Sequence, residues 1–342
     1  MKGMGKLILV YTYWGVPNYG AWTQAYAFNC VLNEKLGVQA EHIAYLEKSH
    51  WDLYYKEDLK AENCFMYDWN RIPHSTIYSE RDLEQQVFDT VITGSDSIWS
   101  FEQFAIRPDL HLMGSGLHTS RLFAYAVSCD RLRKEELTSD MLNAINRYDF
   151  ITVRDKYTKN LIEQHGDYHG HKIDIVLDPA LLWDFKSDTN VSQPTFHDYI
   201  AVYGASWDDD YIIRAQEIAR KRGLLLISLG YVNEWCDISI RRNELRTFEW
   251  LGLLKSAEYV FTSTFHGLMV SLNFEKQVTL DSVSSVVNRS DTLIDKLNIR
   301  DELMDFSSEI DYKSCNSILN QEREQSFLTL QKMIFGGSSR NG

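Results

Sequence analysis

The chain has few basic residues, no CxxC cysteine pair and no long apolar run, and each of these absences disfavours one class of protein. Its 342 residues include 35 Lys and Arg against 48 Asp and Glu, a formal net charge of −13. Because nucleic-acid binding needs a basic face for the phosphates, DNA and RNA are disfavoured as partners. The five cysteines are scattered without a CxxC pair, which disfavours a disulfide framework and fits a reducing cytoplasm. No apolar run is long enough to cross a bilayer, and the N-terminal "KLILVYTYWG" favours a first strand over a signal-peptide core.

Motifs for common cofactors are missing as well. There is no GxxxxGK[ST] loop, no GxGxxG and no GxSxG, so nothing indicates ATP, NAD or serine-hydrolase chemistry, and we expect no cofactor. The stretch "HGDYHGH" offers His165, His169 and His171, but it lacks the cysteine or carboxylate spacing of a metal site. The acids of "WDDD" (207–210) resemble the paired aspartates of sugar-nucleotide enzymes, yet they open a predicted helix, where the dipole alone favours them. No metal is therefore expected.

The chain does contain a regular alternation of strands and helices. Apolar, β-rich stretches such as 6–13 and 199–204 are followed by helical spacing, the pattern of α/β domains with buried parallel strands. The alternation lapses between Asp178 and His197, where two of the five prolines lie. A chain of this length suits two cores. We therefore predict two Rossmann-like domains, residues 1–185 and 198–312, followed by a helix at 313–335. The aromatic-rich stretch 51–77 shows no clean period.

Four polar stretches directly follow predicted strands. They are "PNYGA" (17–21), "TGSDSIW" (93–99), "VRD" (153–155) and "TSTFHG" (262–267). Ligands of open α/β sheets bind at the carboxyl ends of the strands. We therefore expect these stretches to converge on one pocket between the two domains.

The stretch 262–267 puts hydroxyls and a histidine where a strand meets a helix. His266 would lie in the first helical turn, where backbone N–H groups favour an anion. Ser263 and Thr264 add hydroxyls, and Gly267 lets a ligand approach the backbone. The alternative is a helix cap beside a structural histidine.

Two charged residues at strand ends are further candidates. Arg154 ends an apolar strand, where a buried guanidinium needs an anionic partner. That partner is either a ligand or a carboxylate such as Asp155. Asp96 follows a glycine and a serine in a strand-to-helix turn, where it is either a functional acid or an N-cap.

Seven stretches, in order along the chain, resemble the polysaccharide pyruvyl transferase family. They are NYGAWTQAYA (18–27), DTVITGSDSIW (89–99), AYAVS (124–128), ITVRD (151–155), VLDPALL (176–182), TSTFHG (262–267) and NRSDTLIDKLNI (288–299). This chain departs from the usual family residues at Thr23, Ser97, Ile98, Cys129, Asp130 and Thr264. None of these departures removes the histidine, the arginine or the aspartate.

The resemblance implies a fold, a reaction and a set of site residues. The fold would be a GT-B-like pair of Rossmann-like domains with the site in the interdomain cleft, the acceptor on the N-terminal side and the donor on the C-terminal side. The reaction would transfer pyruvyl from phosphoenolpyruvate to two hydroxyls of a sugar, forming a ketal. Catalytic roles would fall to His266 as acid, Asp96 as base and Arg154 as anion partner. Donor binding would involve Ser263, Thr264, Phe265, Gly267 and Arg289. Other substrate contacts would come from Asn18, Tyr19, Gly20, Gln24, Ser95 and Trp99.

Other functions remain open on the sequence. One is a GT-B-type glycosyltransferase or sugar-nucleotide epimerase that uses His266 against a nucleotide diphosphate, and another is a non-catalytic glycan-binding protein. The aromatic segment Trp51–Trp69 has three readings: contact with the acceptor, core packing, or rest on a membrane interface. The partners expected are phosphoenolpyruvate and a glycan or lipid-linked saccharide, in the cytoplasm or at the inner face of the membrane. The sugar itself is not indicated.

Overall fold

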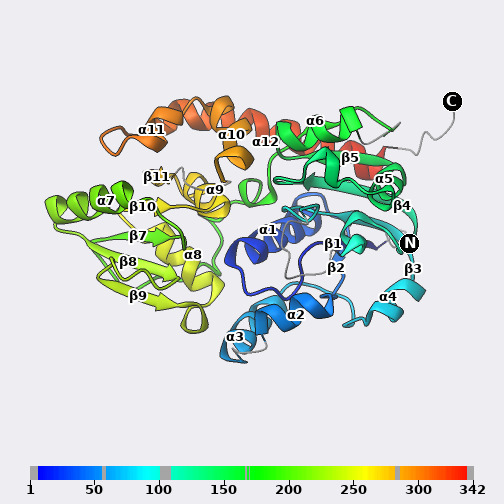
Figure 1. Cartoon of the computed structure of the whole chain (residues 1–342), viewed down its shortest axis with the longest axis horizontal. Helices are drawn as coiled ribbons and strands as arrows, with labels where there is room; N and C mark the ends of the chain where they lie inside the picture. The colour runs from blue at the N-terminus through cyan, green and yellow to red at the C-terminus, as the bar shows by residue number, and fades with distance from the viewer. Residues whose placement is uncertain are drawn as a thin grey trace.

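Two parallel β-sheets stand side by side in the computed structural model, which describes residues 7–55, 59–100, 109–165, 168, 170–281 and 286–336 (Figure 1). The first sheet has the order β2-β1-β3-β4-β5-β6 and the second β11-β10-β7-β8-β9. The strands of the first sheet are β1 (Ile8–Tyr11), β2 (Ala40–His42), β3 (Val87–Thr93), β4 (His118–Val127), β5 (Phe150–Val153) and β6 (Asp174–Ile175). Those of the second are β7 (Tyr199–Tyr203), β8 (Leu225–Gly230), β9 (Ile238–Arg241), β10 (Tyr259–Thr262) and β11 (Val278–Leu280). The strands of the two sheets thus fall on either side of the segment expected to join the domains.

Helices cover both sheets. They are α1 (Tyr19–Cys30), α2 (Lys48–Tyr55), α3 (Leu59–Trp69), α4 (Glu80–Gln85), α5 (Ser139–Asn146), α6 (Lys156–His165), α7 (Asp209–Arg222), α8 (Thr247–Ser256), α9 (Phe265–Asn273), α10 (Val286–Leu297), α11 (Arg300–Met304) and α12 (Tyr312–Phe335). Short turns of other helix types include η1 (Val31–Lys35), η2 (Leu110–Met113), η3 (Lys134–Glu136), η4 (Pro179–Leu181) and η5 (Arg242–Glu244). The helices lie on both faces of the parallel sheets, as a doubly wound α/β fold requires.

Several local expectations need correction. The aromatic stretch 51–77, for which no regular structure was expected, lies largely in α2 and α3. The single helix expected across 134–148 is instead η3 followed by α5, because Thr138 begins a new helix by accepting a hydrogen bond from the backbone of Met141. The strand expected around 172–179 is only the two residues of β6. The frayed end expected after 335 falls almost wholly on residues outside the described part of the chain.

The two domains share an apolar core where α1 meets α8. Tyr19 stacks on Trp250 with ring centroids 5.2 Å apart and an interplanar angle of 7°. Trp22 meets Phe248 edge to face at 4.9 Å, and aromatic pairs of this kind contribute about 0.5–1.5 kcal/mol beyond burial. The Tyr19 hydroxyl donates to the carbonyl of Leu245 at 2.9 Å. This packing fixes the start of α1 against the C-terminal domain, and α1 also contacts α9.

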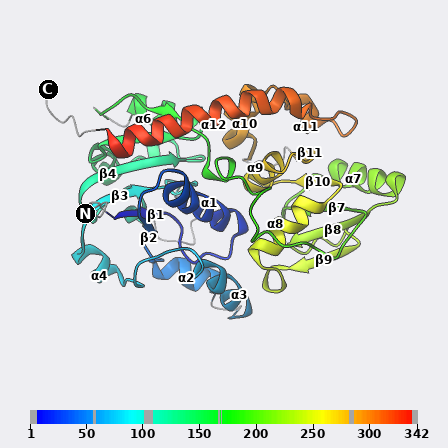
Figure 2. The ribbon, with the colours of Figure 1, turned by 180° about the vertical axis from the view of Figure 1, so that it is seen from behind.

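The long helix α12 returns from the C-terminal domain to the N-terminal one (Figure 2). The Arg121 guanidinium on β4 donates to the carbonyls of Met333 at 3.1 Å and Ile334 at 2.8 Å. The backbone N–H of Leu177 donates to the Ser326 hydroxyl at 2.9 Å. The helix therefore braces both domains along one side of the molecule. Among the described residues, no helix has the length and apolarity that a membrane span requires.

Candidate active site

The ends of β3, β5 and β6 bring two carboxylates to one buried arginine. Arg154, directly after β5, donates from Nη1 to Asp178 Oδ2 at 2.9 Å and from Nη2 to Asp96 Oδ1 at 3.2 Å. Nη2 also donates to the Ser97 hydroxyl at 2.9 Å. Asp155, suggested by sequence as one possible partner, accepts a hydrogen bond from the backbone of Thr158 at 2.7 Å. Arg154 is therefore ion-paired, but with acids brought from two other strand ends.

The Arg154 side chain is only 2% exposed, and its Nε has no hydrogen-bond partner among the described residues. The Phe265 ring covers the guanidinium, with 4.0 Å between the ring centroid and Cζ. A buried guanidinium stays charged because of its very high intrinsic pKa. The unused Nε marks a position where an additional acceptor would be favourable.

Asp178 links the arginine to the histidine. Its Oδ1 lies 3.7 Å from His266 Nε2, and the same oxygen caps η4 by accepting from the backbone of Ala180 at 3.0 Å. Burial would raise the pKa of Asp178, but the positive charges of His266 and Arg154 outweigh it and lower that pKa to about 2. Asp178 is therefore an anion that pairs with Arg154 and lies beside His266.

Asp96 is held in a left-handed backbone conformation, with φ at 84°. For a residue other than glycine this costs on the order of 1–3 kcal/mol, and such strain tends to occur at functional positions. Burial opposes ionisation of Asp96, yet His266 and Arg154 lower the pKa of its carboxyl below the usual value. No helix of the described residues begins at Asp96, so the N-cap alternative is not what the structure shows.

His266 lies in the first turn of α9, and the helix cap that the sequence allowed for its stretch is present. The Thr264 hydroxyl caps the helix by accepting from the backbone of Gly267 at 3.0 Å. The imidazole is buried, at 8% exposed, and its Nε2 has no hydrogen-bond partner among the described residues. A Cβ placed on Gly20 would lie 2.5 Å from His266 Cγ and 2.7 Å from its Cβ. Glycine at the start of α1 is therefore what allows the histidine to occupy this position.

Arg289 brings a second guanidinium from α10. Its Nη1 donates to the Ser97 hydroxyl at 3.3 Å and its Nε lies 3.3 Å from Asp130 Oδ1. Burial lowers the pKa of Arg289, since it disfavours the charged form. The backbone of Lys156 donates to Thr292 at 2.9 Å and holds α10 against α6. Ser97 and Asp130, both departures from the usual family residues, are thus the contacts of Arg289 across the domain boundary.

The remaining sequence candidates divide into two groups. Gln24 and Ser95 lie beside Asp178, because the Ser95 hydroxyl is 2.7 Å from Gln24 Oε1 and 3.3 Å from Asp178 Oδ2. Trp99 is fully buried and donates to the Leu112 carbonyl at 3.0 Å, within the apolar core on one face of the first sheet. Asn18 caps α1 by accepting from the backbone N–H groups of Gly20 at 2.8 Å and Ala21 at 3.1 Å.

Tyr19, like Trp99, has a packing role, since its ring and hydroxyl contact Trp250 and Leu245 at the domain interface. Ser263 is buried, and its backbone N–H donates to the Tyr203 carbonyl at 3.2 Å. A Cβ on Gly267 would lie 2.6 Å from the Thr264 hydroxyl, so this glycine permits the tight turn at the cap. The stretch 262–267 is therefore compact around the histidine.

Sequence reasoning missed three members of the cluster: Ser97, Asp130 and Asp178. Asp178 carried a usable signal, because it lies at the end of the last predicted strand of the first domain and stands before a proline. Ser97 and Asp130 gave no such signal. Their role depends on Arg289, which lies 192 positions after Ser97 in the chain.

The weaker candidates stand apart from the cluster. Asp208 caps α7 by accepting from the backbone of Asp210 at 2.9 Å, which confirms the helix-start interpretation. His171 packs on Phe150 with ring centroids 5.0 Å apart, His165 ends α6, and His169 lies outside the described residues.

In the aromatic segment, Tyr55 and Trp69 are buried. The Tyr55 hydroxyl donates to the Gly15 carbonyl, and Trp69 Nε1 donates to the Val16 carbonyl at 3.0 Å. Trp51 is half-buried and packs on Tyr55 at 4.7 Å. Burial supports a packing role for two of these three rings.

Among solved structures, this chain is similar to two proteins of the same fold. A putative UDP-N-acetylglucosamine 2-epimerase from Listeria monocytogenes aligns at a TM-score of 0.51 and 11% identity over 99% of this chain and 98% of that chain. S. aureus MnaA, in a co-structure with UDP, aligns at a TM-score of 0.50 and 12% identity over 95% and 97%. Identities this low show the fold alone, and they confirm the expected two-domain GT-B-like arrangement.

Sequence comparison identifies the family. A search of curated protein sequences finds no match. The family profile described as polysaccharide pyruvyl transferase matches residues 18–280, which is most of the chain. That span contains Asp96, Arg154, Asp178 and His266, the buried cluster at the junction of the domains. On this match, the chain belongs to the polysaccharide pyruvyl transferase family.

Proposed function

We propose that this transferase moves the pyruvyl group of phosphoenolpyruvate onto two hydroxyls of one sugar, forming a cyclic ketal in a surface glycan or its lipid-linked precursor. The observation that carries the proposal is the buried cluster of Arg154, Asp96, Asp178 and His266, because it gathers an acid, a base and a positive centre at the domain boundary. Phosphoenolpyruvate needs all three, since it carries a carboxylate and a phosphate and reacts through proton transfer.

His266 is the proposed general acid. The C2 of phosphoenolpyruvate becomes electrophilic when C3 receives a proton, and histidine, with an ordinary pKa around 6.5, is suited to deliver it near neutral pH. Asp178 supports this role by its position, because its carboxylate lies 3.7 Å from Nε2 of the imidazole. Asp96 is the proposed base that takes the proton of the attacking sugar hydroxyl, and its lowered pKa means that the carboxyl is in the ionised form that a base requires.

The two arginines would have different roles, Arg154 holding the aspartates and Arg289 binding the anionic donor. Arg154 already pairs with two carboxylates, so we propose that it fixes Asp96 and Asp178 in place and offers only its remaining Nε toward the donor. Arg289, in the first turn of α10, is the proposed partner for the donor phosphate or carboxylate. The start of α9, with Ser263, Thr264 and Phe265, would complete the donor side.

The competing function is a nucleotide-sugar enzyme, either a glycosyltransferase or an epimerase. It is favoured by one observation, the fold likeness to enzymes whose descriptions name UDP or UDP-N-acetylglucosamine. A glycan-binding protein without turnover is the remaining alternative, and nothing in the cluster favours it over catalysis.

One experiment separates the three functions. Purified protein is incubated with phosphoenolpyruvate and a panel of galactosides, glucosides and mannosamine-containing glycans, and released phosphate and the mass of each glycan are measured. Equal amounts of phosphate and pyruvylated glycan support the proposal. Thermal stabilisation by UDP or a UDP-sugar, without phosphate release on any glycan, would support the nucleotide-sugar enzyme. Stabilisation by a glycan alone would support the binding protein.

A further inference from the structure

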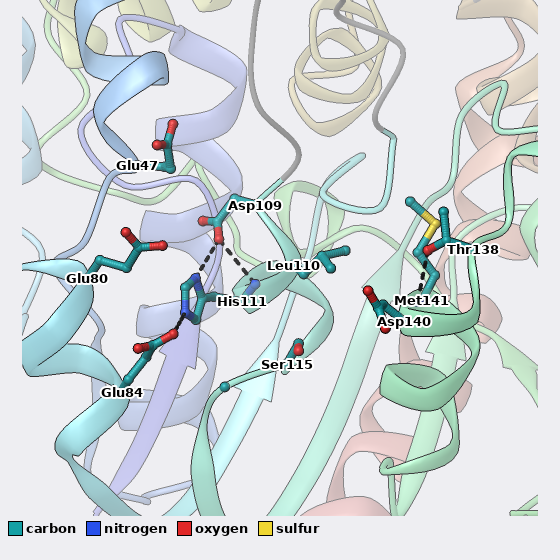
Figure 3. A pocket seen from close by; sticks show the side chains of 11 residues that line it. Glu47, Glu80, Glu84, Asp109, Leu110, His111, Ser115, Thr138, Asp140 and Met141 are labelled. Atoms are coloured by element: carbon teal, nitrogen blue, oxygen red, sulfur yellow. Dashed lines mark hydrogen bonds and ion pairs between the residues drawn. The ribbon is translucent and has the colours of Figure 1, made fainter.

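A second group of chemically active side chains lies in a cavity of the N-terminal domain that shares no residue with the cluster around Arg154. The cavity has a volume of about 440 Å³. Its lining includes five carboxylates, from Glu47, Glu80, Glu84, Asp109 and Asp140, together with His111, and the lining residues described contain no Lys or Arg (Figure 3). A concave site lined by charges of one sign attracts ions of the opposite sign. The charge of this cavity therefore suits a cation.

Three side chains in the cavity meet in the geometry of a metal-binding group. Glu80 and Glu84 lie one turn apart on α4, so both carboxylates project from the same face of that helix. His111 comes from η2, a separate segment between β3 and β4. One ligand atom from each of the three lies within 4.8 Å of the others, and His111 Nε2 is 3.3 Å from Glu84 Oε1.

The imidazole of His111 is held so that Nε2 points into the cavity. Its Nδ1 is 2.7 Å from Asp109 Oδ1 (Figure 3). The other oxygen of Asp109 accepts from the Tyr11 hydroxyl at 2.8 Å. The side chain of His111 is 10% exposed. A carboxylate behind a histidine is the arrangement that orients the ring in metal sites, because it fixes the tautomer that leaves Nε2 free to coordinate.

The backbone also leaves room beside the ligand atoms. Gly116 has a φ of 74°, and a Cβ there would lie 3.1 Å from His111 Nε2 and 3.4 Å from Glu84 Oε1. A side chain at this position would crowd the space where an ion would sit. Glycine keeps that space open.

We propose that Glu80, Glu84 and His111 bind one divalent transition-metal ion of the Zn²⁺ type, with Asp109 as the positioning residue behind His111. One imidazole with two carboxylates is a ligand set that suits Zn²⁺, whereas Mg²⁺ and Ca²⁺ prefer oxygen alone. The ion cross-links α4 to the segment that carries η2, and thereby stabilises the N-terminal domain. It takes no part in the transfer reaction, and the site was not foreseen from the sequence, where only the histidines near 165–171 were considered.

The test is calorimetric titration of chelator-treated, dialysed full-length protein with Zn²⁺, alongside thermal unfolding with and without Zn²⁺, Mg²⁺ or Ca²⁺. The expected result is one Zn²⁺ bound per chain and a raised melting temperature, with no shift from Mg²⁺ or Ca²⁺ at the same concentration. The double variant Glu80→Gln and Glu84→Gln is the main probe, because neither side chain is fully buried and its fold should survive. It should lose the Zn²⁺-dependent shift and weaken binding at least about 10-fold.

A matched control is Glu217→Gln with Glu324→Gln, which removes two exposed carboxylates on α7 and α12 and should leave Zn²⁺ binding unchanged. The variant Asp109→Asn should weaken Zn²⁺ binding about 10–100-fold, as loss of an orienting carboxylate does elsewhere. Absence of Zn²⁺ binding to the wild type would overturn the proposal and leave His111 and Glu84 as an ion pair. Binding that survives in the Glu80→Gln, Glu84→Gln protein would overturn it equally, by showing that Zn²⁺ is held elsewhere, for example by cysteines.

Discussion

The variant Gly20→Ala tests whether the position of His266 matters for turnover. A methyl group on Gly20 would lie 2.5 Å from His266 Cγ, whereas carbon atoms pack favourably at roughly 3.5 Å or more. The imidazole would therefore move by about 1 Å, and misplacement of a catalytic group by that distance can cost about 10²-fold in rate. Its distance to Asp178, 3.7 Å in the wild type, would change with it.

The same change should alter stability only modestly. Overpacking a buried site costs about 1–3 kcal/mol, while alanine in place of glycine within a helix recovers up to about 1 kcal/mol. Gly37→Ala is the matched control, because Gly37 has a φ of 65° and no neighbouring atom within 4 Å of an added Cβ. That substitution costs about 1–2 kcal/mol through the backbone alone. It should leave turnover intact.

Phosphate release from phosphoenolpyruvate with a reactive acceptor is the assay, measured with melting temperatures for each variant. Gly20→Ala should also be made in a His266→Gln protein. There it should lower the rate of phosphate release by less than about threefold relative to His266→Gln alone, since both changes act through one side chain. The reasoning fails if Gly20→Ala retains activity within about threefold of wild type. It also fails if the turnover of the double variant equals the product of the separate losses of Gly20→Ala and His266→Gln.

Three further predictions concern the remaining members of the cluster and the aromatic segment. The lowered pKa of Asp178, about 2 against a usual 3.8, means that its ionised form stabilises the fold above about pH 4 and loses this contribution as the pH falls toward 2; the unfolding free energy of wild type, followed by urea titration, should fall by about 2 kcal/mol more over that range than that of Asp178→Asn. Arg154→Lys should lower turnover although the charge is kept, because an ammonium cannot hold Asp96 and Asp178 with a planar fork; an unchanged kcat and KM for phosphoenolpyruvate would contradict this. Trp69→Ala and Tyr55→Ala should lower stability by about 3–5 kcal/mol as buried rings, whereas Trp51→Ala should keep stability and raise the acceptor KM, with liposome binding measured to test the membrane alternative.

Much of the fold could be predicted because the strands are buried on both faces. The strands β1, β5, β7 and β10 are continuous apolar runs. The ends of β3, β5 and β10 identified Asp96, Arg154 and His266. The helices α2 and α3 escaped prediction because exposed residues such as Leu53 and Tyr67 stand among the buried rings and obscure the helical spacing. Short or edge elements such as α4 and β9 were also missed, since a few half-exposed residues carry little periodicity.

The limits at the site have a similar physical origin. The sequence allowed an ion pair of Arg154 with Asp155 or another carboxylate but did not identify which one. The partners are Asp178, 24 positions away, and Asp96, 58 positions away, and only the folded sheet brings them together. Trp99 was placed at the site by its position after a strand, yet its ring turns into the core. The contact between Ser97 and Arg289 depends on how the two domains dock, which local patterns do not encode.

The most direct test of the central claim is a comparison of wild type and His266→Gln with phosphoenolpyruvate and an accepted glycan, measuring phosphate and pyruvylated product from the same reaction. If His266 is the general acid of a pyruvyl transfer, the variant should fold normally and form both products more slowly by about 10² or more. Wild-type rates in the variant would contradict the account, because the histidine would then be structural. Failure of the wild type to form a pyruvylated product with any glycan in the panel would contradict the proposed pyruvyl transfer itself.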